Sequence, residues 1–160
     1  MLSQLGNFLI SGSILLSFCL IYFSLKEFNS NTIKISSKLL QLSFLQLLLI
    51  CLSFIILLTG YIISDFSLVN VYENSHTTKP LFYKISGVWG NHEGSLLLWI
   101  SILIIFSFLF TYKNRSLEKK FIYLTLFFQN ILISGFLIFL LTNSNPFSMI
   151  YPVPKEGLGL

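Results

Sequence analysis

Long runs of apolar residues alternate with shorter polar segments along the whole chain of 160 residues. Each of four runs holds about 20 residues, which at about 1.5 Å per residue matches the roughly 30 Å hydrocarbon core of a bilayer. The pattern therefore predicts an all-α integral membrane protein with about four transmembrane helices. The predicted spans are residues 8–25, 39–63, 93–112 and 121–142.

The polar segments are the predicted connections of a single membrane domain, residues 1–160. The longest of them, residues 64–92, predicts one long loop outside the bilayer. Within this loop, residues 66–72 alternate enough to predict a short strand or extended segment, and residues 81–88 are compatible with an interfacial helix. Three prolines in residues 143–160 predict an extended tail that forms no helix of its own.

The basic residues of the connections predict the orientation of the chain. Seven Lys and Arg residues occupy the first and third connections, whereas the second connection and the tail hold three. The first and third connections are therefore expected to face inside. Both termini and the 64–92 loop then face outside, which is the intermembrane space of a mitochondrion or the periplasm of a bacterium. The seven are Lys26, Lys34, Lys38, Lys113, Arg115, Lys119 and Lys120.

Composition excludes several classes of protein. A mean hydropathy of +0.81 with 10% charged residues lies far from the roughly 25% charged residues of soluble domains, so a compact soluble enzyme is excluded. The formal charge of +4 is spread among apolar segments without a basic stripe, so membrane lipid is an expected partner and nucleic acid is not. The chain has no alanine but 17 phenylalanines, a bias toward AT-rich codons. This bias suggests an organellar gene and favours the mitochondrial inner membrane, with a bacterial inner membrane as the alternative.

Polar and small residues inside the spans predict helix packing rather than transport. Asn130, Ser134 and Gly135 are expected to face another helix, since polar groups that face lipid are costly. Cys19 and Cys51 lie inside apolar runs and are expected to be packing residues. The spans lack the charged residues of an ion pathway. The sequence also lacks a paired metal-ligand spacing, a haem-attachment motif and a nucleophile elbow, so no metal site and no catalytic residue is predicted in this chain.

One short region, just before the third span, concentrates the residues that could carry chemistry. Asn91 can cap the following helix, and Glu93 would lie in its first turn, where the helix dipole favours a carboxylate. One interpretation is a capped helix start with aromatic anchors at the membrane interface. The other makes His92 and Glu93 a polar contact point for a substrate or cofactor at the membrane surface. The candidate residues are Trp89, Gly90, His92, Glu93, Gly94, Ser95 and Trp99.

The segment 89–99, WGNHEGSLLLW, resembles the WG-x-HEGS-LLLW signature of the cytochrome c maturation protein F family of haem lyases. Residues 65–75 resemble the outer loop of that family, and residues 142–157 resemble the segment after its fourth span. Family members continue through a Trp-rich WWD region and later spans with haem-ligating histidines, which this sequence lacks. The resemblance therefore implies the N-terminal subunit of a split haem lyase, and no haem ligand can be carried over to it.

For such a subunit, the resemblance implies covalent ligation of haem to apocytochrome c on the outer membrane face. It implies that the complex handles the haem, that a haem chaperone supplies it, and that quinol can supply electrons. A partner chain would bear the WWD loop and the haem-ligating histidines, so this chain is not expected to be catalytic alone. The candidate residues would contact haem, quinol or apocytochrome. A second hypothesis is a structural membrane subunit of a larger respiratory complex that has lost the lyase chemistry.

Overall fold

The computed structural model describes residues 1–28, 37–113 and 117–159, and these residues form six α-helices. They contain no sheet, only an isolated antiparallel bridge between Leu68 and Met149. The predicted all-α fold is confirmed. The helices are α1 (Leu2–Phe28), α2 (Ser37–Ile63), α3 (Val69–Asn74), α4 (Leu81–Gly87), α5 (His92–Lys113) and α6 (Lys119–Asn143).

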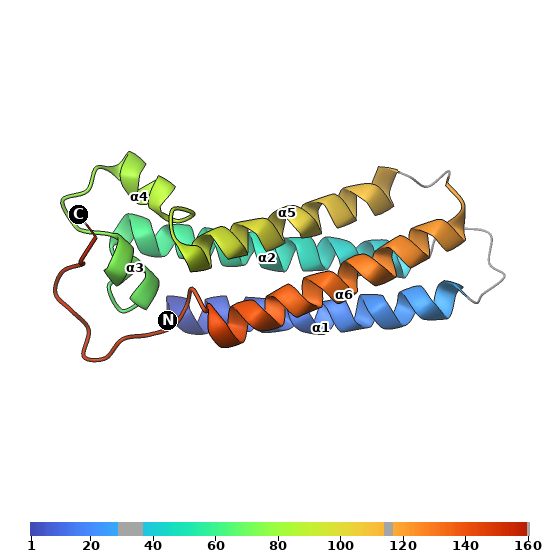
Figure 1. The fold of residues 1–160 in the computed structure, drawn as a ribbon, viewed down its shortest axis with the longest axis horizontal. Helices are drawn as coiled ribbons and strands as arrows, with labels where there is room; N and C mark the ends of the chain where they lie inside the picture. Colours follow the sequence, from blue (N-terminus) through green and yellow to red (C-terminus); the bar gives the residue numbers. More distant parts are fainter. Residues whose placement is uncertain (29–36, 114–116, 160) are drawn as a thin grey trace.

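The four long helices lie side by side in an elongated bundle (Figure 1). Helix α1 packs against α2 and α6, and α5 packs against the same two neighbours, so the four form a closed ring. All four are long and apolar enough to cross a membrane, and each contains one predicted span. Helix α1 begins at Leu2, earlier than the predicted residue 8, because Ser3 and Gly6 in its first turns pack inside the bundle.

The interior of the bundle is lined by small and polar residues as well as aliphatic ones. Along α1 the buried positions recur every three or four residues, the spacing of a left-handed helix bundle. The outer surfaces carry exposed Phe, Leu and Ile, so apolar side chains face outward and small ones let the helices approach closely. This distribution is typical of a multi-pass membrane protein. The buried residues of α1 are Ser3, Gly6, Ile10, Ser13, Ser17, Leu20 and Ser24.

Polar groups at membrane depth face neighbouring helices. The Gln46 side chain of α2 donates a hydrogen bond of 2.6 Å to the Ser17 hydroxyl of α1. Asn130 and Ser134 of α6 are buried, as the sequence predicts. The prediction for Gly135 is wrong, since a Cβ added there would meet nothing within 4 Å. Successive residues of a helix point about 100° apart, so Gly135 faces outward when Ser134 faces inward.

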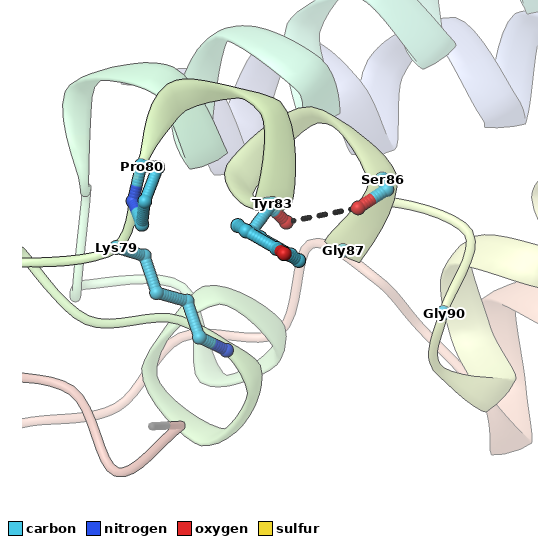
Figure 2. A pocket seen from close by; sticks show the side chains of 6 residues that line it. All are labelled: Lys79, Pro80, Tyr83, Ser86, Gly87 and Gly90. Atoms are coloured by element: carbon cyan, nitrogen blue, oxygen red, sulfur yellow. Dashed lines mark hydrogen bonds between the residues drawn. The ribbon is translucent and has the colours of Figure 1, made fainter.

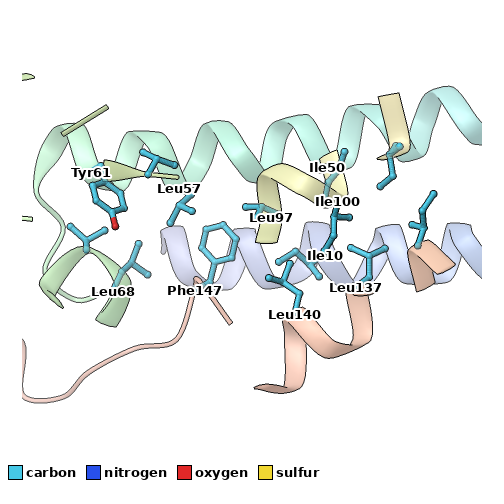
Figure 3. Close-up of a cluster of buried hydrophobic side chains, with 14 of the residues drawn as sticks. Ile10, Ile50, Leu57, Tyr61, Leu68, Leu97, Ile100, Leu137, Leu140 and Phe147 are labelled. Atoms are coloured by element: carbon cyan, nitrogen blue, oxygen red, sulfur yellow. The ribbon is translucent and has the colours of Figure 1, made fainter. Parts of the chain in front are cut away.

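Both termini, α3 and α4 gather at one end of the bundle (Figure 1). The tail returns from α6 across this end: Phe147 is buried against Gly6, and the Val69 N–H donates to the Ser148 carbonyl at 3.0 Å. Figure 3 shows Phe147 among core side chains of the long helices. Lys34 and Arg115, both used for the predicted orientation, lie outside the described residues.

Three local predictions for this end differ in outcome. The predicted helix over 81–88 is confirmed by α4, and the predicted tail has no helix within residues 144–159. The predicted extended segment 66–72 is wrong from Val69 onward, because Val69–Asn74 is helical. The alternation of Val, Asn and Tyr there resembles a strand, but tertiary hydrogen bonds to Asn70 stabilise one helical turn instead.

Candidate functional site

The turn between α4 and α5 has a geometry that requires specific residues. The Asn91 Oδ1 accepts a hydrogen bond of 2.7 Å from the Gly94 N–H, and the Asn91 carbonyl accepts the Ser95 N–H at 3.0 Å. Asn91 is therefore the N-cap of α5, as the sequence predicts. A Cβ at Gly94 would collide with the Val88 carbonyl oxygen, so only glycine lets the chain fold back this tightly.

A hydrogen-bonded polar network lies directly behind this turn. Asn91 Nδ2 donates to the Tyr61 hydroxyl at 2.9 Å and to the Gly87 carbonyl at 2.8 Å. The Tyr61 hydroxyl donates to Asn70 Oδ1 at 2.7 Å. Asn70 Nδ2 in turn donates to Asn91 Oδ1 at 2.7 Å and to Glu93 Oε2 at 3.0 Å. The network joins the end of α2, α3 and the start of α5.

Tyr61 and Asn70 are not predicted from the sequence as residues of the site. Tyr61 is fully buried near the end of α2, and a buried tyrosine hydroxyl needs a hydrogen-bond partner. The sequence does contain a signal for these residues: Tyr61 lies at the end of a long apolar run, and two asparagines, Asn70 and Asn74, follow it as possible hydrogen-bond partners. Buried polar networks are strong when every member is paired, so this one fixes the relative positions of three helices.

The candidate residues divide into an outward-facing and an inward-facing group. Trp89 is 44% exposed, and Gly90 and His92 are exposed as well. Among the residues described, the His92 side chain has no hydrogen-bond partner, and only its backbone carbonyl accepts the Ser95 hydroxyl, at 2.9 Å. Glu93 points toward Asn70 in the network. The turn therefore presents a tryptophan and an unpaired histidine at the surface, on a backbone held from behind.

Trp99 lies apart from this turn. It is 66% exposed on α5 and lines an apolar groove of about 450 Å³ between α5 and α6. At about 1.5 Å per residue, its α-carbon is about 10 Å along the helix from that of His92. The structure thus does not bring the two tryptophans of the motif into one site. The groove is also lined by Leu96, Ile100, Leu103, Leu132 and Phe136.

An open pocket of about 480 Å³ lies beside the turn, along α4. Figure 2 shows the Tyr83 ring in it, with Lys79 on one side and Gly87 on the other. The Lys79 ammonium donates to the Asn74 carbonyl at 3.1 Å, and the Ser86 hydroxyl donates to the Tyr83 carbonyl at 3.3 Å. Within the described ranges, no group of three or more His, Cys, Asp or Glu residues could hold a metal ion.

The tail is attached to the loop before α4 by an acidic side chain. Glu156 accepts the Thr77 N–H at 2.9 Å and the Thr77 hydroxyl at 2.7 Å. These hydrogen bonds lower the pKa of Glu156 below its usual range, and His76, 3.7 Å away, contributes in the same direction. The Leu158 N–H also donates to the Tyr72 carbonyl at 2.7 Å. The tail therefore forms part of the same end of the molecule as the turn.

Comparison with known proteins identifies the family. A family model described as cytochrome C assembly protein matches residues 89–157. The cytochrome c-type biogenesis protein CycK of Rhizobium meliloti is 48% identical over 113 residues, which are 71% of this chain and 17% of that protein. CcmF of Haemophilus influenzae is 32% identical over 158 residues, 98% of this chain and 24% of the relative. The chain belongs to the CcmF-like cytochrome c biogenesis proteins.

The family assignment agrees with the fold and with the resemblance of the motif. A solved structure titled cytochrome c heme lyase CcmF superposes with a TM-score of 0.79 and 23% identity, over 92% of this chain and 25% of that one. At this identity the likeness supports the fold alone. The chain spans about a fifth of the length of the curated relatives it matches, and it corresponds to the N-terminal part of a CcmF-like protein.

Proposed function

We propose that this CcmF-like chain acts as the N-terminal subunit of a cytochrome c haem lyase and assists covalent attachment of haem to apocytochrome c. The observation that carries the proposal is the exposed turn with Trp89 and His92, held from behind by the Tyr61, Asn70 and Asn91 network. Haem is the substrate of the complex. Its ligands lie on a partner chain that bears the WWD loop and the haem-ligating histidines, with haem delivered by a chaperone and electrons supplied by quinol.

The proposal places the chain in the mitochondrial inner membrane, with both termini and the turn toward the intermembrane space. Charge distribution supports this orientation. The end with α3, α4 and the tail carries three lysines against four acidic residues, whereas the described residues at the other end carry five lysines against two glutamates. The more positive end is expected inside.

The orientation can be tested with a cysteine introduced at Ser95 and a membrane-impermeant labelling reagent. The cysteine should be labelled in intact organelles. Labelling only after permeabilisation of the membrane would contradict the orientation.

Deletion of the gene followed by staining for covalent haem tests the function. Loss of stained cytochrome c is expected, together with its recovery on complementation with the wild-type chain. His92→Ala should lower the stain severalfold at unchanged membrane level, because His92 is free to contact haem, quinol or apocytochrome. His76→Ala is the matched control, since it removes a histidine that pairs with Glu156 away from the turn. Unchanged staining in the deletion strain would defeat the proposal.

One observation favours a second candidate function. Among the described residues, the His92 side chain has no hydrogen-bond partner that could orient its ring. A turn of this kind also suits a structural membrane subunit of a respiratory complex without lyase chemistry. Affinity purification separates the two: recovery with haem-lyase partners supports the first function. Stoichiometric recovery with a respiratory complex, together with normal covalent haem, supports the second.

A further inference from the structure

Helix α4 exposes an apolar surface that nothing in the described chain covers. Phe82 is 76% exposed, and its neighbours Leu81 and Tyr83 are exposed as well. The rings of Phe82 and Tyr83 meet edge to face with centroids 6.0 Å apart, so the two side chains form one continuous aromatic surface. No residue of α4 is buried, although the helix packs against α2 through Gly87. Adjacent exposed aromatic side chains of this size are typical of a surface with a partner.

The contact between α4 and α2 sets the depth of α4 in the membrane. The midpoint of α2 (Ser37–Ile63) is Ile50, and Tyr61 lies about 11 residues further, or about 16 Å at about 1.5 Å per residue. Half of a roughly 30 Å hydrocarbon core is about 15 Å. A Cβ at Gly87 would lie 3.2 Å from the Tyr61 ring, so α4 ends directly beside this residue. With the midpoint of α2 placed at the middle of the bilayer, α4, which lies beside the end of α2 (Figure 1), falls where the hydrocarbon meets the headgroups.

Two lysines, one in α4 and one just before it, donate hydrogen bonds to other parts of the protein. The Lys84 ammonium donates to the Ser64 hydroxyl at 2.7 Å, where α2 has just ended. Lys79, which precedes the helix, donates to the Asn74 carbonyl of the outer loop. Both ammonium groups are thus bound to groups of the protein, whereas the Phe82 and Tyr83 side chains are 76% and 61% exposed. Trp89 adds a third exposed aromatic residue just after the helix.

We infer that α4 is an interfacial helix whose partner is the lipid surface of the same membrane, with Leu81, Phe82 and Tyr83 inserted at the boundary of hydrocarbon and headgroups. Aromatic residues flanked by lysines prefer this layer because their rings are apolar and their tips are polar. Through Gly87, which contacts Tyr61, the same helix holds the turn with His92 at the membrane surface. The inference is independent of the proposed haem chemistry, since it rests on depth and exposure.

Depth-dependent fluorescence quenching of the full chain tests the inference. The background variant carries Trp89→Phe and Trp99→Phe, and the reporter is Phe82→Trp, at a position exposed enough to accept the larger ring. The chain is reconstituted in phosphatidylcholine vesicles with or without lipid brominated near the headgroup end of the acyl chains, and iodide serves as the aqueous quencher. The matched control is Tyr151→Trp in the tail, which is 91% exposed.

Bromolipid should quench the Phe82→Trp reporter severalfold more strongly than the Tyr151→Trp control, and iodide should give the reverse order. Equal quenching of the two reporters by iodide would overturn the inference, because α4 would then face water. Protection of Phe82→Trp from both quenchers would also overturn it, in favour of a protein that covers α4. Leu81→Trp provides a second reporter if circular dichroism shows that the first variant is unfolded. None of these results depends on haem attachment, so they leave the proposed function untouched.

Discussion

Replacement of Asn91 should cost more than the loss of an ordinary helix cap. Asn91→Ala removes the acceptor for the Gly94 N–H, a loss of about 1 kcal/mol for a typical cap. It also removes the donor to the Gly87 carbonyl and one of the two acceptors of Asn70 Nδ2. A buried polar group left without its partner costs about 1–3 kcal/mol. The expected total is a loss of about 2–4 kcal/mol in the free energy of unfolding.

Asn91→Asp separates the hydrogen bonds that the Asn91 side chain accepts from those that it donates. The aspartate keeps the acceptor for Gly94 and places a negative charge at the positive end of the α5 dipole. It cannot donate to Tyr61 or Gly87, so its stability should fall between those of the wild type and the alanine variant. The difference between aspartate and alanine then measures the bonds that Asn91 Oδ1 accepts from Gly94 and Asn70, and the difference between wild type and aspartate measures the bonds that its Nδ2 donates to Tyr61 and Gly87.

The assay is equilibrium unfolding in mixed micelles, followed by tryptophan fluorescence of the full chain. His92→Ala is the control, because it changes the next residue, whose exposed side chain lacks a hydrogen bond within the described structure; a change within about 0.5 kcal/mol is expected. A loss of about 1 kcal/mol or less in Asn91→Ala, with Asn91→Asp equal to wild type, would refute the reasoning. In that event Asn91 would be a cap and nothing more.

Three further predictions concern the bundle and the tail. Ser134→Leu should lower the free energy of unfolding by about 1–3 kcal/mol through overpacking, whereas Gly135→Leu, one residue further on the open face, should be tolerated; equal losses would contradict the packing of α6. Gln46→Leu should cost about 0.6–2 kcal/mol, the range for interhelical hydrogen bonds in membranes, and no loss would show that its bond to α1 is not stabilising. Because the folded state lowers the pKa of Glu156, its contribution to tail docking is present above the ordinary carboxyl pKa and lost as the pH falls through the lowered value. Hydrogen-exchange protection of the Leu158 amide should therefore decrease in acid, and Glu156→Gln should abolish that pH dependence; an unchanged profile in this variant would count against the Glu156 contact.

The sequence predicted the four long apolar helices well because the length of each apolar run is set by the bilayer rather than by other parts of the chain. It also predicted the cap at Asn91, since capping depends on residues only three apart. The failures have a common cause. Val69 to Asn74 has the local pattern of a strand, and its helical turn depends on hydrogen bonds from Tyr61 and to Glu93, which are distant in sequence.

The sequence by itself determined an all-α membrane protein, its four long apolar helices and the position of the motif before α5. These features follow from local rules: the length of apolar runs, the helical period and the chemistry of a helix start. The tertiary structure alone decided that Tyr61 and Asn70 hold the turn, that the tail returns to α3, and that Trp99 faces a separate groove. Such features depend on which side chains meet across helices. The apolar pattern of the sequence does not predict these contacts, because both the inward and the outward face of each helix are apolar.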